Sequence, residues 1–370
     1  MMEEAGYRDP RAVAALLRAA KAEAASLHRP LVLMEVCGTH THAIAEAGLR
    51  GKLAPEIRLV SGPGCPVCVT PVGYLDRAEA LARQRNAVLC TFGDLFRVPS
   101  STGSLERLKA EGGDVRIVYS PRDALRVASE NPGREVVFLA VGFETTAPTI
   151  AAALVEAEGA GLSNFMILPG NKTVPMPLRV LAGDPALRLD GFLLPGHVSV
   201  VTGSEAFSFL ASDYGIPSAV VGFAPTDVLA GVADLAAQRR GGRAGVSNLY
   251  GRAVTPQGNA VARAAMDRVF RPESSDWRGL GPIPESGLLL RESLAHRDAS
   301  RLEVDVPVPE EPAGCLCGEV LKGAVEPPAC PLFGTACTPD LPVGACMVSS
   351  EGTCAAYYRH ERWRLAGGAA

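Results

Sequence analysis

The sequence predicts an α/β fold with two related halves and a small cysteine-rich module at its C-terminal end. Short apolar runs bounded by glycine or proline alternate with longer helical patterns, which is typical of parallel sheets with crossover helices. Val221-Gly222-Phe223 repeats Val141-Gly142-Phe143, a short sign of two related halves. Six of the ten cysteines lie between Cys315 and Cys354, which indicates that the last part of the chain is a cysteine-rich module distinct from the α/β region.

The composition indicates an ordinary globular protein and excludes some classes of function. The chain has 370 residues, 47% apolar and 21% charged, enough for two or three domains with cores of their own. With a net charge of −4 and no basic run, it has no electrostatic footprint for nucleic acid. No apolar run approaches the roughly 20 residues of a membrane span, and the acidic start lacks a signal-peptide pattern. We therefore expect a cytoplasmic protein, whose cysteines are metal ligands or reactive thiols rather than structural disulfides.

The first helix and strand lead to the first reactive motif. Residues 11–26 predict an alanine-rich helix, and residues 31–36 predict a buried strand that ends at Cys37-Gly-Thr-His40-Thr-His42. Ligands of open α/β sheets bind at the carboxyl ends of the strands. The spacing of Cys37 and His40 suits two ligands of one metal, and His42 is a weaker candidate.

A glycine- and proline-rich motif, Gly62-Pro-Gly-Cys65-Pro-Val-Cys68, joins the next predicted strand, residues 57–60, to a helical pattern at residues 75–84. Two thiols three positions apart can bind one metal or form a disulfide with each other. We expect Thr70 to cap the helix and Pro71 to be its first residue, so that the helix dipole favours the thiolate form of both cysteines. Metal binding, dithiol redox chemistry and an inert turn all remain open for this motif.

The rest of the α/β region continues the alternation. Strands are expected at residues 87–92, 115–119 and 135–141, and Cys90 reads as a buried apolar side chain within the first of them. Glu144 follows the third strand, either as a solvated cap or ion-pair partner or as a site residue. A second sheet is expected from residues 165–168, 192–194 and 219–223. Helices are expected at residues 226–239 and, capped by Thr255, at 255–270. The predicted divisions are residues 1–155, 156–275 and 276–370, with a proline-rich linker at 307–312.

The tail cysteines follow the spacing C-x-C-x12-C-x6-C-x8-C-x7-C. Four thiolates can hold an iron–sulfur cluster, and the remaining two could form a redox disulfide beside it. Zinc and simple buried thiols are the alternatives, although the paired C-x-x-C spacing of structural zinc sites does not occur here. The spacing alone does not identify the ligands.

Several long motifs in order resemble those of the [NiFe]-hydrogenase maturation factor HypD family, over about residues 31–359. The matching stretches are Met-Glu-Val-Cys-Gly-Thr-His-Thr-His (34–42), Gly-Pro-Gly-Cys-Pro-Val-Cys (62–68), Gly-Phe-Glu-Thr-Thr-Ala-Pro (142–148), Leu-Pro-Gly-His-Val-Ser (194–199) and the array 315–354. The resemblance implies two similar parallel-sheet α/β domains and a C-terminal module with a [4Fe-4S] cluster.

The same resemblance implies roles for the tail residues. The cluster ligands would be Cys315, Cys330, Cys337 and Cys354. Cys317 and Cys346 would be an exchanging dithiol, in an arrangement similar to that of ferredoxin:thioredoxin reductase. Glu351, between the last two cysteines, would pass protons or only cap a turn.

The family also implies a cargo and partners. A HypC-type chaperone would hold, with this chain, an iron that carries two cyanides and one carbon monoxide, and a HypE-type protein would donate the cyanide. Cys37, Cys65 and Cys68 would surround that iron, with His40 beside them. These expectations describe a redox-active maturation scaffold rather than a conventional enzyme. The alternative is an iron–sulfur thiol-disulfide reductase, which leaves Cys37, His40 and the Gly62–Cys68 motif without a role.

Overall fold

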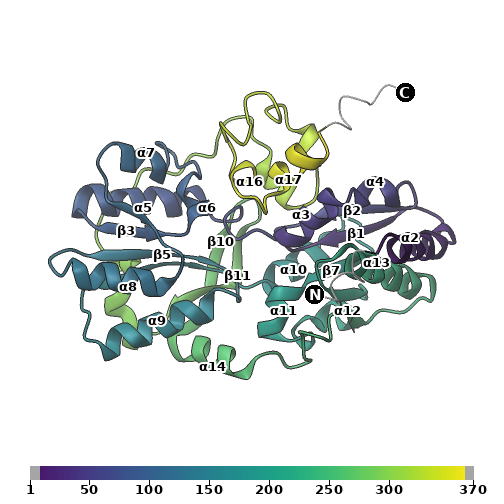
Figure 1. The fold of residues 1–370 in the computed structure, drawn as a ribbon, viewed down its shortest axis with the longest axis horizontal. Coiled ribbons are helices and arrows are strands. Elements are labelled where there is room, and N and C mark those ends of the chain that lie inside the picture. Colours follow the sequence, from purple (N-terminus) through teal and green to yellow (C-terminus); the bar gives the residue numbers. More distant parts are fainter. Residues whose placement is uncertain (1–8, 363–370) are drawn as a thin grey trace.

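Two parallel sheets stand side by side in the computed structural model, which describes residues 9–362 (Figure 1). The first sheet has the strand order β2-β1-β7-β8-β9 and consists of β1 (Leu31–Glu35), β2 (Ile57–Ser61), β7 (Gly191–Pro195), β8 (Ser218–Val221) and β9 (Val246–Asn248). The second has the order β4-β3-β5-β6 and consists of β3 (Val88–Thr91), β4 (Val115–Ile117), β5 (Val136–Gly142) and β6 (Phe165–Asn171). The predicted α/β class is confirmed.

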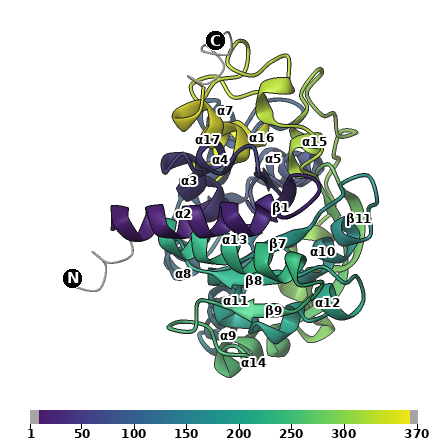
Figure 2. The same cartoon turned by 90° about the vertical axis from the view of Figure 1, so that its right-hand side faces the viewer.

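Helices cover both sheets, because apolar side chains on the central strands must be buried on both faces. Around the first sheet lie α2 (Pro10–Ala25), α3 (Gly38–Glu46), α4 (Leu49–Leu53), α10 (Pro175–Ala182), α11 (Gly196–Thr202), the 3-10 helix η1 (Glu205–Phe207), α12 (Phe209–Ser212) and α13 (Pro225–Arg240). Helices α2 and α13 run side by side on one of its faces (Figure 2). Around the second sheet lie α5 (Val72–Arg85), α6 (Gly93–Phe96), α7 (Leu105–Ala110), α8 (Pro121–Glu130) and α9 (Ala147–Gly159).

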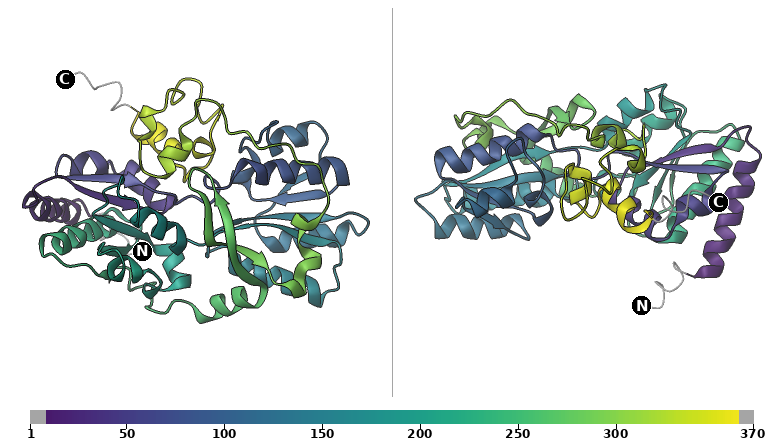
Figure 3. Two further views of the ribbon diagram at one scale, coloured as in Figure 1. Left: turned by 180° about the vertical axis from the view of Figure 1, so that it is seen from behind. Right: turned by 90° about the horizontal axis from the view of Figure 1, so that it is seen from above.

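Each sheet with its surrounding helices forms one lobe of the molecule. The C-terminal third of the chain joins the two lobes. Helix α14 (Ala260–Val269) leads into an antiparallel hairpin of β10 (Phe270–Trp277) and β11 (Gly281–Leu290), which stands between the lobes (Figure 3). The short 3-10 helices η2 (Glu292–Arg297) and η3 (Ala299–Arg301) then pack beside β6. The tail contains α15 (Cys317–Leu321), η4 (Pro327–Ala329), α16 (Ala345–Val348) and α17 (Thr353–His360) and lies over the junction of the lobes.

The assignment of strands to sheets differs from the prediction. Residues 165–171 pair with β5, whereas β7 and β8 pair within the sheet that contains β1. The predicted second sheet was therefore wrong, and a boundary at residue 155 does not separate the two sheets. A buried apolar run looks the same in either sheet, because the neighbour of a parallel strand is set by its crossover connection and not by its local sequence.

Two predicted helix caps were also wrong. Helix α5 begins at Val72, and the Thr70 hydroxyl donates to the carbonyl of Pro66 at 2.8 Å instead of capping the helix. Helix α14 begins at Ala260, where the side chain of Asn259 accepts a hydrogen bond from the Ala262 amide at 3.0 Å. Thr255 therefore precedes that helix by a short loop.

Within residues 9–362, every helix is too short or too polar to cross a bilayer.

Candidate functional site

The carboxyl ends of β1 and β2 bring the first two cysteine motifs together. These strands are parallel neighbours, with Glu35 opposite Ser61, so the segments that follow them start at one edge of the sheet. The Gly38 amide donates to the Gly64 carbonyl at 2.9 Å. A side chain at Gly64 would place its Cβ only 2.6 Å from the Cα of Cys37. Glycine is therefore required there for the two motifs to touch.

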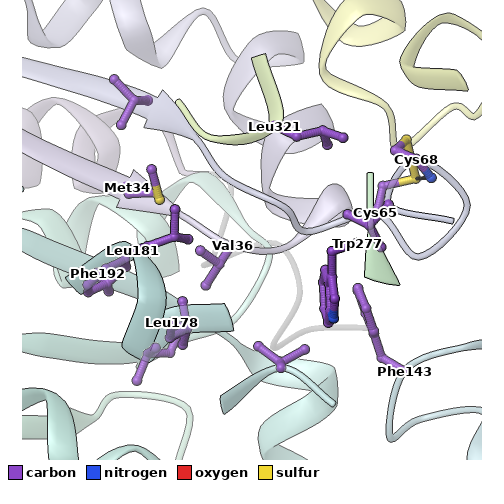
Figure 4. Close-up of a cluster of buried hydrophobic side chains, with 14 of the residues drawn as sticks. Met34, Val36, Cys65, Cys68, Phe143, Leu178, Leu181, Phe192, Trp277 and Leu321 are labelled. Carbon is purple, nitrogen blue, oxygen red and sulfur yellow. Dashed lines mark hydrogen bonds between the residues drawn. A yellow bond between two sulfur atoms is a disulfide. The ribbon is translucent and has the colours of Figure 1, made fainter. Parts of the chain in front are cut away.

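Cys65 and Cys68 form a disulfide, with Cα atoms 5.3 Å apart. Both are buried, at the end of an apolar cluster that also contains Phe143 and Trp277 (Figure 4). The expected thiolates at a helix N-terminus are thus not what the structure has, because the sulfurs are bonded to each other and α5 starts four residues after Cys68. The pairing corresponds to the dithiol redox alternative.

Cys37 is a buried thiol at the N-terminal end of α3. Burial raises its pKa to about 12, so it is neutral at ordinary pH. Its backbone amide donates to Glu35 at 3.3 Å, and the Thr41 hydroxyl donates to the same carboxylate at 2.6 Å. Glu35 therefore fixes the backbone that presents the Cys37 sulfur.

A buried ion-pair network connects Glu35 to the tail. Arg50 lies 3.6 Å from Glu35 and 2.8 Å from Glu361, and it donates to the Ser61 hydroxyl at 2.8 Å. Its guanidinium also stacks over the ring of Tyr357, 4.6 Å from the centroid. Burial raises the pKa of Glu35 to about 7, while Arg50 acts in the opposite direction. Arg50 and Glu361 were not recognised from sequence, because a lone arginine and a lone glutamate give no local signal.

His40 lies inside the site and His42 points elsewhere. The ring of His40 is fully buried, which lowers its pKa to about 4, and its Nε2 lies 2.9 Å from the Gly222 carbonyl. A carbonyl only accepts, so Nε2 carries the hydrogen and Nδ1 keeps a lone pair, which has no hydrogen-bond partner. His42 instead contacts the ring of His360 on α17, with centroids 4.9 Å apart.

A further histidine reaches the same region. His197 follows the carboxyl end of β7, and its ring lies over Phe223 at 4.0 Å, while Phe223 contacts His40 at 4.8 Å. Partial burial lowers the pKa of His197, and the nearby Glu351 acts in the opposite direction. Its position after a strand end was a signal that the sequence analysis did not use.

Loops and short helices, rather than strands, hold the six tail cysteines. All six line one small cavity: Cys315, Cys317, Cys330, Cys337, Cys346 and Cys354. The sulfurs of Cys317 and Cys346 are 2.9 Å apart. Hydrogen bonds from Cys315 and Cys346 lower the pKa of Cys317 well below its usual value, so Cys317 is the sulfur of the pair that more readily becomes a thiolate. Gly344 leaves room for the sulfur of Cys315, because a Cβ at this position would lie only 2.7 Å from it.

The tail also touches the strand-end cysteines. Thr39 donates to the Glu351 carboxylate at 2.8 Å, and Gly38 packs directly against Glu351. The sulfur of Cys68 lies 3.9 Å from the carbonyl of Ala345, the residue before Cys346. The tail is held there in part by Ser349, whose hydroxyl donates to Asp94 at 2.8 Å. The two sulfur groups are therefore adjacent in the fold.

The six thiols of the tail cavity suit a metal cluster better than a single metal ion. In the part of the chain that the structure describes, no three His, Cys, Asp or Glu side chains surround a point where one metal ion could sit. In an iron–sulfur cluster the four thiolates bind different iron atoms, so they need not meet at one point. A set of six thiols without carboxylate or imidazole fits such a cluster.

Known proteins are similar to this chain over almost all of its length. A family model described as "HypD: Hydrogenase formation hypA family" matches residues 11–361. The hydrogenase maturation factor HypD of Rhodobacter capsulatus is 46% identical over 370 residues, covering 97% of this chain and 98% of the relative. HypD of Azotobacter vinelandii is 45% identical, covering 97% of each chain. HypD of Escherichia coli K12 is also 45% identical, covering 96% of this chain and 97% of the relative.

Proposed function

Because this chain belongs to the HypD family of hydrogenase maturation factors, we propose that it is the scaffold on which the Fe(CN)2CO group is assembled. A HypC-type chaperone would share the iron, and a HypE-type protein would donate cyanide. A maturation factor works with partners, and these two classes are the ones that the sequence resemblance implies. The cytoplasmic location stays a prediction.

One observation supports this proposal more than any other: the backbone of Cys37 packs against Gly64, the residue before the Cys65–Cys68 disulfide, and Cys68 in turn approaches the tail at Ala345. Iron that carries cyanide and carbon monoxide is electron-rich, and soft thiolates are suitable donors for it. Cys37 is neutral when buried and would have to lose its proton when it binds iron. The His40 Nδ1 lone pair is a nearby acceptor for that proton or a further ligand.

Opening the Cys65–Cys68 disulfide takes two electrons and two protons, after which both sulfurs could bind iron. A [4Fe-4S] cluster on Cys315, Cys330, Cys337 and Cys354 would supply electrons when bound. Between the two regions stand Cys317 and Cys346, close enough to form and open a disulfide with little movement. The approach of Cys68 to Ala345 supports this order of contacts.

The proposal is tested by infrared absorption of the anaerobic complex with a HypC-type chaperone. Bound cyanide and carbon monoxide absorb in the triple-bond region, where protein groups do not. We expect these bands in the wild-type complex and their loss in Cys37→Ala. Cys90→Ala is the matched control, because Cys90 is also a fully buried thiol but lies in β3 of the other sheet. Equal bands in both variants would refute the scaffold role of Cys37.

The electron path has its own test. Cys317→Ala combined with Cys346→Ala leaves the four proposed cluster ligands in place, so the anaerobically purified protein should remain brown. Hydrogenase maturation should nevertheless fall steeply, since the dithiol is missing. Maturation at the full rate would show that the dithiol is not part of the path.

An iron–sulfur thiol-disulfide reductase remains the second candidate. The Cys65–Cys68 disulfide beside Cys346 favours it, because a disulfide next to a dithiol is the arrangement that exchange requires. The two functions differ in their need for Cys37. Reduction of an external protein disulfide should survive Cys37→Ala, whereas Fe(CN)2CO assembly should not.

A further inference from the structure

A cavity of about 630 Å³ lies at the junction of the two lobes, lined by residues that have no part in the sulfur site. The first lobe contributes α10, α11 and η1, and the second contributes Glu144. The hairpin between the lobes and its preceding helix α14 supply the rest of the wall. Helix α14 lies below the junction in Figure 1, and the tail helices α16 and α17 lie above it. Its volume is in the range of small-molecule sites, which commonly occur between domains.

Glu144 is the unexplained group in this cavity. It follows the carboxyl end of β5, is only 3% exposed and lines the cavity. Its Oε1 accepts a hydrogen bond from the Val174 amide at 2.9 Å, but its buried Oε2 has no hydrogen-bond partner. Among the ion pairs found within residues 9–362, none involves Glu144. The sequence alternatives of a solvated cap and an ion-pair partner are therefore both wrong.

The nearest lysine along the chain does not compensate this carboxylate. Lys172, two residues before Val174, donates to the Ser275 hydroxyl and to the Asp276 carbonyl, each at 2.6 Å. Burial without a partner raises the pKa of Glu144 to about 7. A buried, ionised carboxylate without a charged partner lowers the stability of the folded chain. A positively charged ligand that pairs with it would recover that free energy.

The other lining residues indicate the chemistry of such a partner. Three further acids, Glu205, Asp267 and Glu285, stand at the exposed rim, against one base, Arg263, whose guanidinium already donates to the Gln257 carbonyl at 2.9 Å. Apolar side chains make up much of the remaining wall: Pro175, Met176, Val201, Met266 and Leu288. The cavity is thus lined by four carboxylates, one buried and three at the rim, and by apolar side chains, which suits a cation on a short hydrocarbon chain.

We propose that this cavity binds an alkylammonium or alkylguanidinium group, with the Glu144 carboxylate as its buried anchor. The same chemistry occurs in a free amine or guanidine and in a lysine or arginine side chain of a partner protein. Such a ligand would touch both lobes, since the Val174 amide that holds Glu144 belongs to the segment that crosses from β6 to α10. The site is separate from the iron scaffold and does not depend on it.

The test is calorimetric titration of the full chain with n-butylguanidinium, and with n-butylurea as its uncharged match. We expect the cation to bind at least about tenfold more tightly than the urea, because only the cation pairs with Glu144. Glu144→Gln should remove that preference. Glu130→Gln is the matched control, because Glu130 is an exposed carboxylate on the same lobe, outside the cavity, and should leave it intact.

A second variant protects the test against a folding defect of Glu144→Gln. Met266→Trp adds bulk to the apolar wall of the cavity and should weaken binding of n-butylguanidinium without changing any charge. The peptide acetyl-Gly-Arg-Gly-amide distinguishes the sources: tighter binding of the peptide than of the free cation assigns the site to a partner's side chain, and the reverse assigns it to a small molecule. Equal binding of cation and urea by the wild type, or a full preference in Glu144→Gln, would overturn the proposal.

Discussion

Each of the two parallel sheets ends one of its central strands in a buried carboxylate, and the two carboxylates have different surroundings. Glu35, at the end of β1, receives hydrogen bonds from Thr41 and the Cys37 amide and lies 3.6 Å from Arg50. Glu144, two residues after the end of β5, receives one hydrogen bond from Val174 and has an unpartnered oxygen. Burial raises the pKa of both to about 7.

This difference in hydrogen-bond partners indicates different roles: Glu35 supports the structure around it, and Glu144 is available to a ligand. A carboxylate surrounded by fixed donors holds its neighbours in place, and Glu35 does so for the backbone of Cys37. A buried carboxylate with an unpartnered oxygen, at the wall of a cavity, stores a cost that a ligand can relieve. The two carboxylates are alike in burial and in pKa. They differ in the number of hydrogen-bond and ion-pair partners that each one has.

Removing the cation beside Glu35 should have the largest effect. Arg50→Met leaves Glu35 and Glu361 buried without their shared guanidinium, and we expect the free energy of unfolding to fall by about 3–5 kcal/mol. Urea denaturation at pH 7.5 measures it. Arg83→Met removes an exposed pair with Glu111 and should leave stability nearly unchanged. A similar small loss for both variants would mean that Arg50 does not compensate the buried carboxylates.

Glu144 should respond to pH in the direction opposite to a paired carboxylate. Its pKa in the folded chain, about 7, lies above its ordinary value of 4.5. The folded state therefore binds this proton more tightly than the unfolded state, and its contribution to stability is complete below pH 4.5 and lost as the pH rises to 7. Glu144→Gln has no proton to lose, so it should become more stable than the wild type by up to about 3 kcal/mol across this range.

The measurement is the free energy of unfolding of both chains, determined at intervals from pH 4.5 to pH 8. Only the difference between the two curves reports Glu144, since every other titrating group is common to both. The difference should rise with pH up to about 7 and then stay constant. A flat difference would show that Glu144 titrates normally, and a falling one would show that a cation already pairs with it.

Much of the fold was readable from sequence because each central strand is a short apolar run. The strands β1 to β8 all lie where such runs were predicted, but their distribution between two sheets was not, because strand order depends on long crossovers. The helix starts at Val72 and Ala260 were missed because the threonine expected to cap each helix does not do so: no side chain caps α5, and Asn259 rather than Thr255 caps α14.

The candidate site was predictable to a different degree in its two parts. Cys37 and the Gly62–Cys68 motif follow neighbouring parallel strands, so their approach follows from general rules of α/β sheets. The tail cysteines lie in loops and short helices, and their common cavity could not be derived from spacing. Arg50 and Glu361 act through contacts between distant segments, which no local pattern records, whereas the place of His197 after β7 could have marked it.

The smallest expected effect is a coupling energy, and a pair of double-mutant cycles compares it at Glu35 and at Glu144. Thr41→Val removes the hydroxyl that donates to Glu35, and by itself should cost about 1–2 kcal/mol of unfolding free energy. Combined with Glu35→Gln, it should show a coupling energy of about 1 kcal/mol, because the two side chains share one hydrogen bond.

Thr173 lines the same cavity as Glu144, but its hydroxyl faces the Glu285 carbonyl at 3.5 Å. Thr173→Val with Glu144→Gln should therefore be additive within about 0.5 kcal/mol. Coupling of equal size in both cycles would mean that Glu144 is as fully partnered as Glu35, and the cavity would then lose its anchor.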